Sequence, residues 1–167
     1  MVMKVVFLSP AYPVEMQHYV RGLCEVGAQV YGIGDGGIPE TQKKYLSGYL
    51  KIDRLFDEKE LVSKGTAYAA SIGANRVESL WEPLTLPAAK IRSNLGISGM
   101  SPDTVIGFRD KSIMKERVAA AGLRVPYAFR CTTQTEIEAA IEKIGYPVII
   151  KPIAGAGSAD TPSLIHI

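Results

Sequence analysis

A lysine followed by a small-residue loop is the feature of this 167-residue chain most suggestive of chemistry. Residues 147–150 form a short apolar run rich in β-branched side chains, which favours a buried strand, and Lys151 follows directly. Residues 155–158 can adopt positive φ angles and can present backbone N–H groups to an anion. The members of this loop are Gly155, Ala156, Gly157 and Ser158. The pattern predicts a phosphate site, although an ordinary exit from a strand into a loop looks the same.

A second lysine, Lys111, lies at an unfavourable position for a cation on a helix. Lys111 falls in the first turn of a helix expected over residues 110–121, where the helix dipole mildly disfavours a cation. Such a lysine either binds an anion or is simply a solvated surface residue. The glycines at 34, 36 and 37 follow the second expected strand instead of the first, so they favour a tight turn over a dinucleotide fingerprint.

Glu82 is a candidate on the substrate side. It comes just after an expected strand at 76–80, and ligands of parallel sheets bind at the carboxyl ends of the strands. The alternative is an acid that interacts favourably with the N-terminus of the following helix.

The elements that would position these residues differ between the two halves of the chain. The first half alternates strands and helices, which predicts an α/β fold with a parallel, doubly wound sheet. Its expected strands cover residues 4–8, 29–33, 49–52 and 76–80, and its expected helices cover 14–26, 57–72 and 84–95. Residues 97–106 are expected to form a connection that contains a domain boundary near Pro102.

The second half predicts the order helix, strand, helix, strand. The helix at 110–121 precedes an expected strand at 125–130, and a capping box at 133–136 opens a second helix. The apolar stripe of that second helix is predicted to be buried. It consists of Ile137, Ala140, Ile141 and Ile144.

Composition narrows the class of protein. The chain is 47% hydrophobic and 22% charged with a formal net charge of +2, and it has no basic run, so nucleic acid is not an expected partner. Cys24 and Cys131 belong to no metal-binding spacing and are expected to be buried, reduced thiols. No apolar run approaches the length of a membrane span, so a soluble, cytoplasmic protein is expected.

The motifs of the second half, taken in order, resemble the ATP-grasp superfamily of biotin carboxylase, carbamoyl phosphate synthetase and D-alanine–D-alanine ligase. They are GFRDK at 107–111, MKER at 114–117, AGLRVP at 121–126, GYPVIIKP at 145–152 and GAGS at 155–158. The resemblance implies a Rossmann-like pre-ATP-grasp domain over residues 1–102. It also implies an incomplete N-terminal subdomain of the ATP-grasp domain over residues 103–161.

The resemblance also implies the chemistry. Lys111 and Lys151 would contact the phosphates of ATP, and the loop of Gly155, Ala156, Gly157 and Ser158 would cover them. A carboxylate or bicarbonate would attack the γ-phosphate, and an amine or similar nucleophile would capture the acyl phosphate, with Mg²⁺ stabilising the developing charge.

The end of the chain departs from this family. Only nine residues follow Ser158, and Asp160 is the only carboxylate after Lys151, whereas the family continues much further and holds its magnesium ligands there. We therefore expect an N-terminal fragment that is inactive alone, with a non-native or disordered tail at 162–167. Self-association through the exposed edges of the strand at 147–150 is a further expectation. The alternatives are a non-catalytic nucleotide-binding module and, without its fingerprint, a dinucleotide-dependent oxidoreductase.

Overall fold

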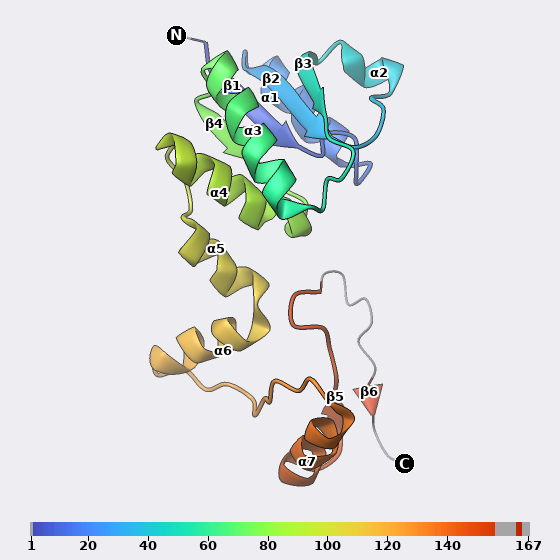
Figure 1. Ribbon diagram of the computed structural model, residues 1–167, viewed down its shortest axis with the longest axis vertical. Helices are drawn as coiled ribbons and strands as arrows, with labels where there is room; N and C mark the ends of the chain where they lie inside the picture. The colour runs from blue at the N-terminus through green and yellow to red at the C-terminus, as the bar shows by residue number, and fades with distance from the viewer. Residues whose placement is uncertain (1, 156–162, 165–167) are drawn as a thin grey trace. The chain divides into compact units, whose positions relative to one another are not determined.

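A computed structural model describes residues 2–155 and 163–164 of the chain (Figure 1). The chain divides into two compact units, Met1–Val105 and Ile106–Ile167, and each is described by itself.

The first unit is built on a four-stranded parallel sheet with the order β3-β2-β1-β4. Its strands are β1 (Lys4–Leu8), β2 (Gln29–Gly34), β3 (Leu46–Lys51) and β4 (Arg76–Glu78). In the central strand, Val6 lies between Tyr31 of β2 and Val77 of β4. The predicted α/β fold with a parallel sheet is therefore confirmed, and the third strand begins three residues earlier than predicted.

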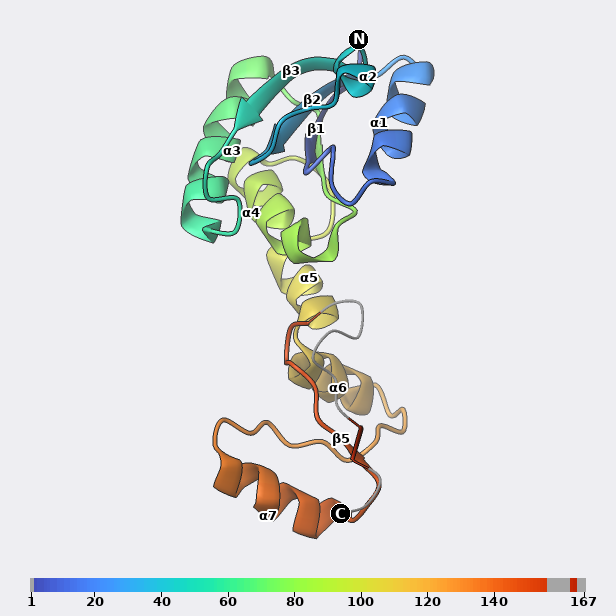
Figure 2. The same ribbon diagram turned by 90° about the vertical axis from the view of Figure 1, so that its right-hand side faces the viewer.

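Helices cover both faces of this sheet (Figure 2). Helix α1 (Met16–Glu25) lies on one face, and α3 (Glu58–Ile72) and α4 (Thr85–Leu95) lie on the other. The short helices α2 (Glu40–Lys43) and η1 (Glu82–Leu84) lie in the connections that follow β2 and β4. This is the layered arrangement in which strands buried on both faces are almost wholly apolar.

The core of the first unit is tightly packed. Phe7, Leu8, Ile33, Leu61 and Ile91 are among its fully buried side chains. Helices α3 and α4 approach so closely that a Cβ added at Gly65 would lie 2.7 Å from Ile91 Cδ1. A glycine at this position therefore sets the spacing between the two helices.

A charged side chain also fills part of this core. Arg92 is 5% exposed, and its Nη1 donates to Val77 O at 2.5 Å. Its Nη2 donates to Met100 O at 3.1 Å, and Glu78 Oε2 lies 3.2 Å from Nη1. The buried guanidinium therefore ties the end of β4 to the turn that follows α4.

The second unit contains α6 (Lys111–Ala120), α7 (Gln134–Ile144) and a two-stranded antiparallel ribbon. The ribbon pairs β5 (Val148–Ile149) with β6 (Ser163–Leu164), so Val148 opposes Leu164. Helix α5 (Pro102–Arg109) begins before the division between the units and ends after it. The predicted capping box of α7 is present: Thr133 Oγ1 accepts from Glu136 N, and the Glu136 carboxylate accepts from Thr133 N.

Two predicted elements are wrong. The expected connection over residues 97–106 contains α5, because Pro102 suits a first helical position and the Ser101 hydroxyl accepts from Thr104 N at 3.1 Å. The expected strand at 125–130 has no regular hydrogen-bonded partner in the described part of the chain. Pro126 lies near its start and lacks the N–H group that a ladder needs.

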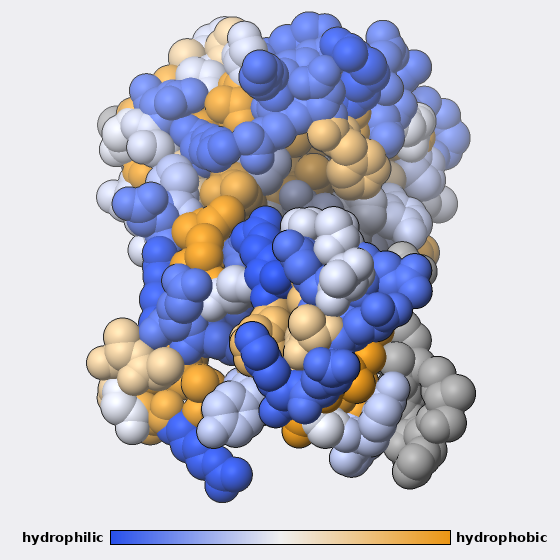
Figure 3. Space-filling model, turned by 60° about the horizontal axis from the view of Figure 1, so that its bottom comes forward, coloured by the Kyte–Doolittle hydropathy of each residue, from blue (hydrophilic) through white to orange (hydrophobic). Residues whose placement is uncertain are grey.

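Burial in the second unit also differs from expectation. Neither α6 nor α7 has a buried residue, and the predicted stripe of α7 is half-buried except for Ile144, which is 38% exposed. Apolar side chains reach the surface of the molecule, as Figure 3 shows. In the second unit the most exposed of them are Tyr127 at 86%, Leu123, Phe108 and Ile149 at 64%, and Phe129 at 48%.

The two cysteines are free, as predicted, but both are half-buried instead of buried. Burial raises the pKa of the Cys24 thiol, which donates to Tyr45 O at 2.8 Å. Within residues 2–155 and 163–164, no helix combines the length and the apolar character needed to cross a membrane.

Candidate nucleotide-phosphate site

Three hydrogen bonds fix the start of the small-residue loop against the start of α6. The backbone N–H of Lys111 donates to Ile153 O at 3.1 Å, and its Nζ donates to Gly155 O at 3.0 Å. Between these two carbonyls, Ala154 O accepts from Arg109 Nη2 at 2.8 Å. Lys111 and Gly155 are 44 residues apart in sequence, and these contacts bring them together. They also satisfy a backbone N–H that the first turn of a helix leaves without an internal partner.

Asp110 caps the same helix. Its Oδ1 accepts from Ser112 N at 2.8 Å and from Ile113 N at 3.1 Å, and its Oδ2 lies 3.4 Å from Arg130 Nη1. The side chain is 15% exposed. The carboxylate next to Lys111 in sequence is therefore engaged by other donors.

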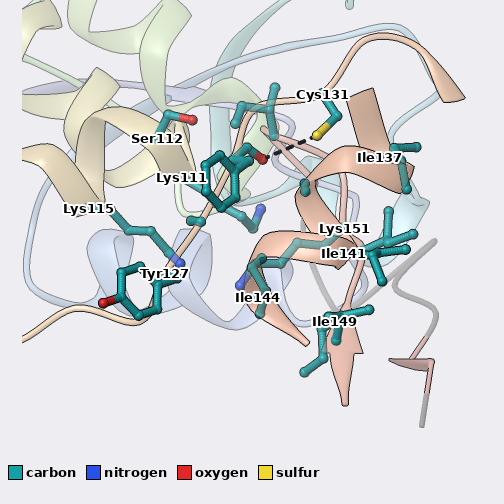
Figure 4. Close-up of a pocket in the computed structure, with 16 residues that line it drawn as sticks. Lys111, Ser112, Lys115, Tyr127, Cys131, Ile137, Ile141, Ile144, Ile149 and Lys151 are labelled. Carbon is teal, nitrogen blue, oxygen red and sulfur yellow. Dashed lines mark hydrogen bonds between the residues drawn. The ribbon is translucent and has the colours of Figure 1, made fainter. Parts of the chain in front are cut away.

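A cavity of about 190 Å³ lies beside this cap. Lys111, Lys115 and Lys151 line it, from the first turns of α6 and from the residue after Ile150 (Figure 4). The rest of the lining is mostly apolar and comes from one further residue of α6, from α7, from β5 and its flanks, and from the 127–131 segment. Those residues are Ser112, Tyr127, Ala128, Phe129, Cys131, Ile137, Ala140, Ile141, Ile144, Val148, Ile149, Ile150 and Ile153.

The charged side chains that line this cavity are all positive. Among its lining residues there are three lysines and no aspartate, glutamate or histidine. Burial, and after it repulsion from the nearby Lys151 ammonium, lowers the pKa of Lys115. Cations that share an apolar site without a counter-charge favour an anionic ligand.

The cavity can therefore hold a molecule with an apolar body and an anionic end. Lysine ammonium groups bind phosphate as point charges, and the apolar side chains of α7 and β5 can cover a planar ring system. ATP has this combination of groups.

A magnesium ion does not fit the described lining. Mg²⁺ takes hard oxygen ligands, usually carboxylates, and the neutral polar side chains of the cavity are two hydroxyls, of Ser112 and Tyr127, and the thiol of Cys131. In the part of the chain that the structure describes, no group of three or more His, Cys, Asp or Glu side chains could hold a metal.

The residues predicted from the sequence have different positions. Lys111, Lys151 and Gly155 are brought together around the cavity and its rim. Ala156, Gly157 and Ser158 lie outside the described residues, as does Asp160. Glu82 is exposed at the start of η1 in the first unit, and its carbonyl accepts from Thr85 Oγ1 at 2.8 Å. It is not among the residues that line this cavity.

Several residues of the site were not predicted. Lys115 stands four residues after Lys111, a spacing that puts both on one helical face and could have indicated a shared role. Tyr127 and Phe129 had no such signal, because the 125–130 segment was expected to be a strand. Arg109 lies in a quoted motif, but its contact with Ala154 O joins residues 45 apart in sequence.

Comparison with known proteins supports the same interpretation. Residues 110–160 match the family described as the carbamoyl-phosphate synthase L chain, ATP binding domain. The L-arginine-specific L-amino acid ligase of Bacillus subtilis is 36% identical over 93 residues, which make up 55% of this chain and 22% of that protein.

Two solved structures show the same fold. The L-amino acid ligase from Bacillus licheniformis has a TM-score of 0.75 at 17% identity, over 98% of this chain and 39% of that chain. The biotin carboxylase domain of the Hydrogenobacter thermophilus 2-oxoglutarate carboxylase was solved with MgADP, ADP and bicarbonate. It has a TM-score of 0.69 at 22% identity, over 99% of this chain and 38% of that domain.

The chain is an α/β protein with a part of the ATP-grasp fold, so the resemblance stated from the sequence is confirmed. Its sequence relatives and structural neighbours include two L-amino acid ligases and a biotin carboxylase domain. The chain spans about a fifth of the length of the curated relative and about two fifths of the solved chains.

Proposed function

We propose that this chain supplies the first nucleotide-binding elements of an ATP-dependent carboxylate ligase. The observation that carries the proposal is the convergence of Lys111 and Lys151, 40 positions apart in sequence, on one cavity with apolar walls. The match of residues 110–160 to an ATP-binding domain covers both lysines.

In this proposal, Lys111 and Lys151 hold the phosphates of ATP, and the loop of Gly155, Ala156, Gly157 and Ser158 covers them. When bound, ATP supplies the phosphoryl group that converts a carboxylate into an acyl phosphate, and an amine then displaces the phosphate. The lysines act by stabilising negative charge, so the reaction requires no covalent protein nucleophile.

The other parts of the chain have separate roles in this proposal. Residues 1–102 form a Rossmann-like pre-ATP-grasp domain, and Glu82 faces the substrate from the carboxyl end of its sheet. Residues 103–161 begin the ATP-grasp domain, and 162–167 form the tail. Magnesium ligands belong to sequence beyond the described cavity, and the 167-residue chain alone does not catalyse ligation.

We assign an amino acid as the amine substrate. The support is that the L-arginine-specific L-amino acid ligase and the Bacillus licheniformis L-amino acid ligase both resemble this chain. We place the enzyme in the cytoplasm, where ATP is made, and we expect association of the chain with itself through β5.

Calorimetric titration of the 167-residue chain with ATP tests the nucleotide site. Lys151→Ala removes one charged contact, which is expected to weaken binding about ten-fold or more while leaving the circular dichroism spectrum unchanged. Lys59→Ala is the matched control, because Lys59 is an exposed lysine of α3 in the first unit. Unfolding of Lys151→Ala, or unchanged ATP affinity, contradicts the proposal.

A non-catalytic nucleotide-binding module is the second candidate, and the absence of any carboxylate among the described lining residues favours it. The two candidates differ in a longer polypeptide that extends to the length of the ligase relatives. ATP hydrolysis dependent on an amino acid and a carboxylate there indicates the ligase, whereas ATP binding without turnover indicates the module.

A further inference from the structure

A third lysine of the cavity has no role in the proposed two-lysine arrangement. Lys115 lies one helical turn after Lys111 on α6, and Figure 4 shows its side chain entering the same pocket as Lys111 and Lys151. Like charges four residues apart on one helix face repel each other, so this placement destabilises the helix of the free chain slightly.

Lys115 has few acceptors or negative charges nearby to offset this repulsion. Its described partner is Pro126 O, a neutral acceptor at 3.4 Å, which is a long hydrogen bond. Asp110, which caps the same helix, is engaged by two backbone N–H groups and by Arg130. Glu116, the neighbour of Lys115 in sequence, is exposed and forms no ion pair with Lys115 in the described part of the chain. Lys151 makes no hydrogen bond or ion pair with the described residues, so it adds positive charge and no acceptor.

The three lysines also differ in how firmly they are held. Lys111 Nζ has an acceptor at 3.0 Å in Gly155 O, and its backbone is fixed at the helix cap. Lys115 Nζ can leave a weak carbonyl contact at little cost, since a charge-assisted hydrogen bond to an anion is stronger than one to a neutral carbonyl.

We propose that Lys115 is a third anion contact of this cavity, which exchanges Pro126 O for a phosphate oxygen of the bound ligand. The inference rests on the proposed function, because it takes the ligand to be a polyphosphate. It adds a binding residue on the α6 side, so that one helix face supplies two ammonium groups and the end of β5 supplies the third.

Inorganic tripolyphosphate tests this inference, because it presents the charges without an adenine ring. We expect Lys115→Met to weaken tripolyphosphate binding to the 167-residue chain about ten-fold, and Lys115→Arg to restore most of the affinity. Arg124→Met is the matched control, since it removes one positive charge from an exposed position outside the cavity lining and is expected to change affinity less than two-fold.

A second measurement separates binding from a purely structural role. Acetylation of the folded wild-type chain, read by peptide mass spectrometry, should modify Lys115, and saturating tripolyphosphate should protect it at least three-fold while Lys59 remains unprotected. Protection of Lys111 and Lys151 without protection of Lys115, or equal affinity of Lys115→Met and wild type, overturns this inference and leaves the proposed function standing. Absence of tripolyphosphate and ATP binding by the wild type overturns both.

Discussion

The two units of the chain use amphipathic helices in different ways. In the first unit, α3 and α4 pack their apolar sides onto a parallel sheet, and Leu61 and Ile91 are fully buried. In the second unit, α7 directs a comparable stripe to the wall of a cavity, where Ile137 and Ile141 are half-buried.

The two units differ in the surroundings of the apolar helix face. A face covered by a sheet loses all its contact with water and contributes about 25 cal/mol per Å² of apolar area. A face that lines a cavity keeps part of that contact and can be covered by a ligand instead. Side-chain packing therefore stabilises the first unit, whereas helix caps and hydrogen bonds largely stabilise the cavity of the second.

Truncation of one leucine or isoleucine in each unit tests this contrast most strongly. Leu61→Ala, in the buried cluster of the first unit, is expected to reduce the free energy of unfolding by about 3 kcal/mol, and Ile141→Ala by about 1 kcal/mol or less. Urea unfolding followed by Trp81, the single tryptophan and a neighbour of that cluster, reports the first unit. Hydrogen exchange of the α7 amides reports the second, and equal costs at the two positions would remove the contrast.

Removal of a helix cap in the second unit should have an intermediate effect. Asp110→Ala takes two hydrogen bonds from the first turn of α6 and is expected to destabilise that helix by about 1–2 kcal/mol. It should also weaken phosphate binding, because the backbone of Lys111 starts from this cap. Hydrogen exchange of the α6 amides measures the loss, and Asp110→Asn, which keeps the cap, is the control. Unchanged exchange in Asp110→Ala would mean that tertiary contacts hold the helix.

The smallest expected effect is a loss of stability of helix α7 at acidic pH. Hydrogen bonds from the backbone and hydroxyl of Thr132, followed by the backbone of Thr133, lower the pKa of Glu136. The folded state binds a proton on the Glu136 carboxylate more weakly than the unfolded state does. The stability that this carboxylate contributes is therefore fully present above the ordinary glutamate pKa. It is lost as pH falls through the lowered value.

Carboxyl-carbon NMR measures this titration directly, together with the exchange of the α7 amides between about pH 6 and pH 2.5. Glu136→Gln should abolish the acid-dependent change, whereas Glu142→Gln, at an exposed position near the other end of α7, should retain it. A Glu136 carboxyl that titrates at the ordinary glutamate pKa would show that the capping box does not persist in solution.

The sequence predicted the periodic elements well because their signals are local. Alternation of strand and helix indicated the parallel sheet, and Asp57, Asp110 and Thr133 marked helix starts that the structure has. The helix at Pro102 was missed because glycine and serine precede it, although a serine hydroxyl before a proline can serve as a cap.

The candidate site was only half predictable for a different reason. Lys111 and Lys151 were found from their motifs, whereas the contacts of Arg109 and the position of Tyr127 depend on chain segments that meet only in space. Apolar periodicity could also not say whether Ile137 and Ile141 face a sheet or a cavity, since both environments require the same residue types.

Gly65 of α3 and Ile91 of α4 pack so closely that side-chain atoms at these two positions compete for the same space. An added methyl group at position 65 would lie 2.7 Å from Ile91 Cδ1, so the end of the Ile91 side chain must shift to accommodate it. Helix α4 also carries Arg92, whose guanidinium holds the end of β4 through Val77 O. A side chain added at position 65 therefore first displaces the end of Ile91, the neighbour of Arg92, and trimming Ile91 to valine removes the atom that the added Cβ would meet.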